Sequence, residues 1–372
     1  MNNIKKNGYI LVAFMISIAS TIIFNMTKDL ALKDLTMAWN ATHYAINYTD
    51  FGFVKRGLIG SLYTLVNGSF SQESLLLFQS LFIVALIFIT HLLFSKLGLQ
   101  KNFIYILFIV SPATFMQFGS DFGRFDSILV SLFMLSVLYR NSSILFLVFS
   151  IVGILTHEIY TFALLPAAFL LYLSNRVDLI SLKDVLTKSI KNKVLYLLLA
   201  SILIVVLLGS YELGYEQILN TFSKSNLPSS YIEYHTTNLT GRPLEIWTRS
   251  IMDNLEFTSS RLSLSVSTIY MTIIYLVILV YFNILGVSFK KPKYYLILLS
   301  GLPMFILGTD WARWLAFIYV SVFIVFITTE RDKAASISNK HLLIFTLYGP
   351  LGVGGFLPPL LSKIYSIYSR VL

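Results

Sequence analysis

The sequence has no cysteine among its 372 residues, and only 12% of the residues are charged. The lack of cysteine excludes disulfides, iron–sulfur clusters and thiolate metal sites. The scarcity of charge, beside 56% hydrophobic residues, excludes an ordinary soluble globular protein. Acidic residues number 18 and Lys plus Arg 28, which gives a net charge of +10. In so apolar a chain this excess is typical of cytoplasmic loops between membrane spans, so no nucleic-acid partner is predicted.

Several motifs are also absent. The sequence contains no His-Glu-x-x-His zinc motif and no Asp-x-Asp metal motif. Gly352, Gly354 and Gly355 lie in an apolar run broken by prolines, and they do not follow a strand, which excludes a dinucleotide-binding loop. We therefore predict no metal and no other cofactor, and we do not expect a cytoplasmic nucleotide-sugar donor.

The chain contains instead a series of apolar runs of about 15–23 residues, a length that spans a bilayer. They predict an all-α, polytopic integral membrane protein with about 11 transmembrane helices, from a retained first span over 9–26 to a last one over 342–361. All of them belong to a single transmembrane domain over residues 1–372. Spans are also predicted over 103–118, 159–173 and 294–307. The segment 57–66 is too short to span, and we expect it to lie in the interface or to re-enter.

Charge sets the predicted orientation of these spans. Lys5 and Lys6 precede the first run, and the other connectors rich in Lys and Arg alternate along the chain as cytoplasmic loops should. The N-terminus is therefore predicted to be cytoplasmic. The segment 28–72 and one long loop, 210–263, are predicted to be periplasmic.

One seven-residue pattern of residue types, called the phrase below, occurs twice in the sequence. Residues 119–125 read Gly-Ser-Asp-Phe-Gly-Arg-Phe, and residues 308–314 read Gly-Thr-Asp-Trp-Ala-Arg-Trp. Each copy places an acid three residues before an arginine, Asp121 before Arg124 and Asp310 before Arg313, so the two side chains can pair or share a ligand. For a single copy, a helix cap with a snorkelling arginine explains the pattern equally well. Two copies at the same membrane surface favour a shared site.

The remaining unusual polar residues fall on the same predicted side of the membrane. They are Asp50 with Lys55 and Arg56, the pair His157-Glu158, and the long loop. The bilayer centre holds almost no ionisable residue apart from His91, whereas a pump needs acids or bases spaced across the membrane. A site on one side only is typical of an enzyme that faces the periplasm.

The residue types indicate the chemistry of this site. Arginine forks match phosphate oxygens, and a lipid-linked diphosphate would place its phosphates at the lipid–water boundary. A carboxylate could accept the proton of an attacking sugar hydroxyl. Glu158 has apolar neighbours and no arginine within a helical turn, so its pKa is expected to be raised. The catalytic candidates are Asp50, Asp121, Glu158 and Asp310; the substrate-binding candidates so far are Lys55, Arg56, Arg124, His157 and Arg313.

With about 11 spans, an acid in the first external loop and acid–arginine phrases at the outer surface, the chain resembles the GT-C type of integral-membrane glycosyltransferases. Those enzymes use polyprenyl-phosphate or polyprenyl-diphosphate sugar donors. The size and the external loop rich in Arg and Tyr also resemble Wzy-type O-antigen polymerases. The resemblance implies that Asp50 takes the place of the GT-C acid, although the second acid of the usual pair is missing. It also implies that Arg242 and Arg249 are the substrate-binding loop arginines of a polymerase.

These observations predict a multi-pass glycosyltransferase of the bacterial inner membrane with a periplasmic active face. Its expected partners are the lipid bilayer, an undecaprenyl-diphosphate-linked oligosaccharide and other membrane proteins of polysaccharide assembly. The main hypothesis is an O-antigen polymerase of lipopolysaccharide or surface polysaccharide biosynthesis. The alternatives are a GT-C enzyme that adds a single sugar from a polyprenyl-phosphate donor, and a polysaccharide flippase or transporter. Asp50 and Glu158 compete for the role of base, and the resemblance favours Asp50.

Overall fold

A computed structural model describes residues 38–67, 71–175, 181–209, 213–227, 251–261, 266–308, 310–338 and 351. Across these residues the named elements are all helices, and an isolated β-bridge joins Ser71 and Asn226. The prediction of an all-α chain is confirmed for this part of the sequence. The first predicted span, the last one except for residue 351, and the loop residues Arg242 and Arg249 lie outside the described residues.

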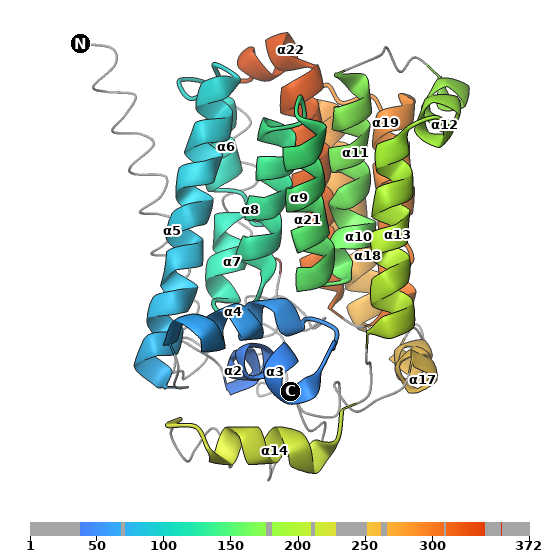
Figure 1. Ribbon diagram of the computed structural model, residues 1–372. Coiled ribbons are helices and arrows are strands. Elements are labelled where there is room, and N and C mark those ends of the chain that lie inside the picture. The colour runs from blue at the N-terminus through green and yellow to red at the C-terminus, as the bar shows by residue number, and fades with distance from the viewer. Residues whose placement is uncertain are drawn as a thin grey trace, which may run out of the picture.

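Figure 1 shows an upright bundle with shorter helices lying across its two ends. The helices across one end are α2 (Ala38–Ala45), α3 (Tyr48–Phe51), α4 (Gly57–Asn67) and α14 (Tyr215–Ser223), with α17 (Ile251–Arg261) beside them. This end is named the α4 end. At the other end, named the α22 end, lie α12 (Leu182–Ile190) and α22 (Arg331–Ala335). The short segment 57–66 therefore crosses the bundle end and does not run along the bundle.

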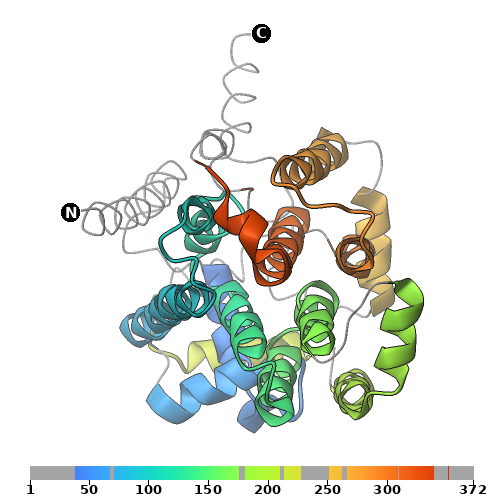
Figure 2. The same cartoon turned by 90° about the horizontal axis from the view of Figure 1, so that it is seen from above.

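The upright helices surround α21 (Trp311–Thr329), which stands inside the ring that Figure 2 shows from above. Every residue from Trp311 to Ile327 is buried, so α21 forms the core of the bundle. The other upright helices are α5 (Gln72–Lys96), α6 (Phe103–Ile109), α7 (Phe115–Ser120), α8 (Asp126–Leu138), α9 (Ser143–Thr156), α10 (Ile159–Ala163), α11 (Leu165–Ser174), α13 (Lys193–Leu208), α18 (Val266–Ile284), α19 (Pro292–Gly301) and α20 (Met304–Leu307).

Two of the described helices, α5 and α21, are long and apolar enough to cross a membrane, and α12 with α13, bent by 76°, makes a third if the pair is one span. Five further apolar segments are shorter. The chain therefore has the helical character of a membrane protein, while the count of 11 spans and their orientation stay predictions.

Proline divides three of the predicted spans into shorter helices. The span 103–118 is divided into α6 and α7 around Pro112, 159–173 into α10 and α11 before Pro166, and 294–307 into α19 and α20 at Pro303. Proline lacks the amide hydrogen that continues a helix, and its ring clashes with the preceding turn. As a result, each repeated phrase follows a short helix, α7 or α20.

Candidate functional site

The two repeated phrases meet at the α4 end of the bundle. The first runs from the last two residues of α7 to the start of α8, and the second lies at the start of α21. Their local structures differ, because the first turns at Gly123 with a left-handed φ of 92° whereas Ala312 of the second is helical. Glycine has no Cβ to oppose that turn. The same sequence pattern therefore delivers its acid and arginine from a turn in one copy and from a helix start in the other.

Arg313, in the first turn of α21, is the centre of the contacts. Its Nε donates to Asp126 Oδ2 at 2.9 Å, and its Nη2 binds the other oxygen of the same carboxylate. Its Nη1 donates to Asp310 Oδ2 at 2.5 Å. Asp126 opens α8, where a negative charge also interacts favourably with the helix dipole. A bidentate fork of this kind fixes the orientation of both side chains.

Arg124 links the two phrases. Its Nε lies 2.8 Å from Asp121 Oδ1, and its Nη1 donates to Asp310 Oδ2 at 2.7 Å. The carboxylate of Asp310 is thus shared by both arginines, and Asp121 lies 3.5 Å from Arg313 Nε. Each acid lies next to the arginine three residues later, as the spacing allowed, and the two phrases contact each other.

A second ion pair adjoins this cluster and joins α9 and α10 to the start of α4. Arg56 Nε donates to both carboxylate oxygens of Glu158, at 3.1 Å from Oε1 and 2.9 Å from Oε2. Arg56 Nη2 also donates to Oε1. Arg56 has a φ of 61°, and no other non-glycine residue in the described ranges has a positive φ. Such a conformation costs on the order of 1–3 kcal/mol and is concentrated at functional sites. The fold holds this guanidinium in place against a backbone preference.

Two buried histidines accompany the ion pairs. His157 Nδ1 lies 3.2 Å from the Ile159 amide nitrogen and 3.2 Å from Glu158 Oε2. Burial, with Arg56 next, lowers the pKa of His157 to about 4 although Glu158 opposes the shift. Burial also lowers the pKa of His43 well below its usual value, and the guanidinium of Arg56 adds to this. Both rings are therefore neutral at physiological pH.

His43 was not among the predicted site residues. It lies on α2, which is tied to the first phrase because Asn40 Nδ2 donates to the Phe122 carbonyl at 2.5 Å. The His43 ring stands edge-on to Phe125, with centroids 5.5 Å apart. The only signal for it in the sequence is its place seven residues before Asp50, in the same predicted external segment.

The carboxyl groups of the site differ in their affinity for protons. Burial raises the pKa of Asp121 to about 6, against the opposing effect of Arg124 and Arg313. Burial alone would also raise the pKa of Asp310, but the same two arginines outweigh it and hold the pKa well below its usual value. For Glu158, Arg56 and then His157 outweigh burial in the same way, so its pKa is well below the ordinary value. The expected rise in the pKa of Glu158 is wrong.

Accessibility separates an inner from an outer part of the site. The side chains of Asp121 and Asp126 are 0% and 2% exposed, whereas those of Glu158 and Asp310 are 38% and 27% exposed. A molecule that approaches the α4 end from outside therefore meets Glu158 and Asp310 first, with Arg56 behind Glu158.

Asp50 is exposed on α3 and does not share these contacts. Its carboxylate accepts the Asn47 side-chain amide at 2.7 Å, and its carbonyl accepts Gln217 of α14 at 3.0 Å. Lys55, next to Arg56, is buried. Within the described ranges no group of three or more His, Asp or Glu side chains is arranged to hold a metal ion.

No protein-family model, curated protein or solved structure matches the chain. The resemblance to GT-C and Wzy-type enzymes stays a hypothesis.

Proposed function

We propose that the chain is a membrane glycosyltransferase that uses a sugar linked to a polyprenyl diphosphate at the α4 end of the bundle. The observation that supports the proposal most is the strained Arg56, whose fork is held on the accessible carboxylate of Glu158 beside the buried Arg124–Arg313 cluster. An arginine fork suits a diphosphate, and a carboxylate within reach suits an acceptor hydroxyl.

In the proposed reaction the diphosphate of the donor binds the guanidinium of Arg56 and displaces the carboxylate of Glu158. Because Arg56 is the main cause of the low pKa of Glu158, the freed carboxylate becomes a stronger base. It accepts the proton of the acceptor hydroxyl as the hydroxyl oxygen bonds to the anomeric carbon. The bond from that carbon to the diphosphate breaks, and the electron pair leaves with the diphosphate, which Arg56 stabilises.

The inner cluster has a supporting role in this proposal. Asp121, Asp126 and Asp310 form ion pairs with Arg124 and Arg313, and rigidly held charges lower the reorganisation needed during reaction. Asp310 is the member that a ligand can reach. The proposal assigns the base to Glu158 in preference to Asp50, because Asp50 contacts Asn47 and Gln217 and not an arginine of the site.

The finer form of the proposal is an O-antigen or surface polysaccharide polymerase of the bacterial inner membrane, with its active face in the periplasm. Its substrate would be an undecaprenyl-diphosphate-linked oligosaccharide. The test is turnover by the full chain in nanodiscs supplied with lipid-linked repeat units. A ladder of products supports the polymerase, whereas a single addition supports a transferase of one sugar. Absence of transfer with lipid-linked donors would contradict the proposed function.

Variants test the roles within the site. Glu158→Gln keeps the shape of the side chain and loses its basicity, so turnover should fall by roughly 100-fold or more, while Asp50→Asn should stay active. Arg56→Lys loses the planar fork and should reduce turnover about tenfold. Arg140→Lys, at the α22 end, is the matched control and should have no effect. If Glu158→Gln had a normal melting temperature and full turnover, Glu158 would not be the base.

A further inference from the structure

The α22 end holds a second ion cluster that the proposed reaction does not use. Glu330 follows the last residue of α21 and binds the amines of Lys291, Lys293 and Lys333 at 2.9, 3.2 and 3.0 Å. The hydroxyl of Tyr294 donates to it at 2.7 Å. Burial alone would raise the pKa of Glu330, but Tyr294 and the lysines outweigh it and hold the pKa at about 2. One carboxylate, ionised at any physiological pH, thus gathers three ammonium groups.

The charges of this cluster do not balance. The Glu330 side chain is only 7% exposed, whereas the side chains of Lys291 and Lys333 are 44% and 56% exposed. The acid is therefore hidden behind the bases, and two positive charges are left in excess on the accessible side. That arrangement presents a cationic surface to any anion that comes from outside.

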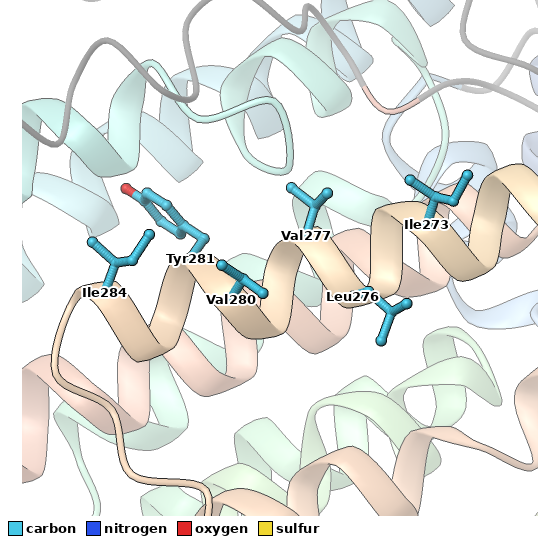
Figure 3. Close-up of a pocket in the computed structure, with 6 residues that line it drawn as sticks. All are labelled: Ile273, Leu276, Val277, Val280, Tyr281 and Ile284. Carbon is cyan, nitrogen blue, oxygen red and sulfur yellow. The ribbon is translucent and has the colours of Figure 1, made fainter.

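An apolar groove runs along α18 near this cluster. It has a volume of about 250 Å³ and is lined by Ile273, Leu276, Val277, Val280, Tyr281 and Ile284. Figure 3 shows these six side chains spread along one stretch of the helix. Ile273, Leu276, Val280 and Ile284 are about half exposed and follow one another at helical spacing. An apolar groove that is open along a helix of this kind suits a hydrocarbon chain.

The lysine cluster lies near the Ile284 end of α18. Two residues beyond the Ile284 end of the groove lies Gly286, whose φ of 84° turns the chain out of α18. The side chain of Lys333 lies 3.9 Å from the position of a Cβ on Gly286. The ring of Phe289 contacts both Phe282 of α18 and Tyr294 of the cluster, with centroids 6.5 and 6.2 Å apart. The cationic cluster therefore lies beyond the Ile284 end of the apolar groove.

We infer that an anionic phospholipid of the adjacent leaflet binds here, with an acyl chain in the α18 groove and its phosphate on Lys291 and Lys333. A lysine binds phosphate as a point charge, and basic residues at a membrane surface attract anionic lipids. Glu330 anchors the ammonium groups and prevents their dispersal into solvent. This site is at the opposite end of the bundle from the proposed reaction, and it does not depend on it.

The test is native mass spectrometry of the delipidated full chain titrated with phosphatidylglycerol or phosphatidylcholine in mixed micelles. Wild type should bind phosphatidylglycerol preferentially. Lys291→Gln with Lys333→Gln should weaken this binding by roughly tenfold or more. This variant leaves Lys293 and Tyr294 on Glu330, so the buried acid stays paired. Lys183→Gln with Lys191→Gln removes two exposed lysines of the same end near α12 and should leave the binding unchanged.

A second variant tests the apolar part of the site. Val277→Trp, which fills the groove and leaves the lysines intact, should weaken phosphatidylglycerol binding by a similar factor, with normal melting as the control for folding. Equal binding of both lipids, or equal loss in the Lys183/Lys191 control, would overturn the inference. So would full competition by chain-free glycerophosphoglycerol or inorganic phosphate at equal concentration, or a groove occupied by a second copy of the chain.

Discussion

The two ends of the bundle solve the placement of charge in opposite ways. At the α4 end, Arg124 and Arg313 are buried, and three aspartates form ion pairs with them. At the α22 end, three lysines surround one acid, and two of them, Lys291 and Lys333, are about half exposed. The planar guanidinium tolerates burial when several oxygens meet its fork, whereas the compact ammonium is strongly hydrated and favours the surface.

The clusters also differ in what they connect. At the α4 end, Arg313 reaches Asp126 across 187 residues of sequence, and Arg56 reaches Glu158 across 102. At the α22 end, Glu330 joins Tyr294 across 36 residues and Lys333 across three. The first cluster therefore ties distant helices of the whole fold together, and the second fastens one local group of helices, α19, α21 and α22. Disruption of the first should be felt throughout the molecule.

The largest effect is expected from Arg313→Ala. The change leaves Asp126 buried without its bidentate partner, and an uncompensated buried charge destabilises a protein by about 3–5 kcal/mol. Thermal unfolding in nanodiscs, compared with wild type, measures the loss. The double variant Arg313→Ala with Asp126→Ala should recover part of the lost stability, since it removes the orphaned charge. A cost below about 1 kcal/mol for the single variant would contradict the view that the cluster ties the fold together.

The second-largest effect is expected in the pH dependence of stability, which should differ between the two ends. The pKa of Asp121 is about 6 in the folded chain, above its ordinary value of 3.8. Between these values the folded state binds a proton that the unfolded state lacks, so acidification from about pH 6 to pH 4 stabilises the fold through this group. His157 acts in the opposite direction in the same window, because its pKa is lowered from 6.5 to about 4.

The informative quantity is therefore the difference between wild type and Asp121→Asn. Wild type should gain a few degrees in melting temperature relative to the variant as the pH falls from 6 to 4. Parallel profiles of the two proteins over this range would mean that the pKa of Asp121 is not raised.

At the α22 end, acidification should destabilise the fold, and it should do so at a lower pH. The pKa of Glu330 is about 2 in the folded chain, below its ordinary value of 4.5. Its contribution to stability is therefore complete above pH 4.5 and is lost as the pH falls towards 2. Glu330→Gln should remove this part of the acid sensitivity, which differential melting between pH 5 and pH 3 measures in nanodiscs; an unchanged acid profile would refute it.

Local spacing made part of the site predictable. Asp121 with Arg124 and Asp310 with Arg313 are three residues apart, and both pairs form, the first across the turn at Gly123 and the second at the start of α21. The predicted topology placed both phrases on one side of the membrane, and in the structure both lie at the α4 end of the bundle. The partners that come from elsewhere were not predictable, because Asp126 with Arg313 and Arg56 with Glu158 depend on how the helices pack.

The errors have the same physical origin. Glu158 was expected to have a raised pKa because the sequence shows no arginine within a helical turn of it, yet the fold brings Arg56 from 102 residues away. His43 was missed because nothing near it in sequence reveals that α2 lies against the first phrase. The all-α fold could be predicted from apolar runs. The runs are divided at Pro112, Pro166 and Pro303 because proline lacks the amide hydrogen that continues a helix.

The smallest effect is expected from Lys333→Gln, and it sharpens the comparison most directly. Lys333 with Glu330 and Arg313 with Asp310 are both ion pairs across three residues. Lys333 is more than half exposed, and Glu330 keeps Lys291, Lys293 and Tyr294 when it is lost. The variant should therefore cost at most about 1 kcal/mol of unfolding free energy, as exposed ion pairs do. If Lys333→Gln lost as much unfolding free energy as Arg313→Ala under the same conditions, burial would not explain the difference between the two ends. The three-residue spacing alone would then set how much each ion pair stabilises the fold.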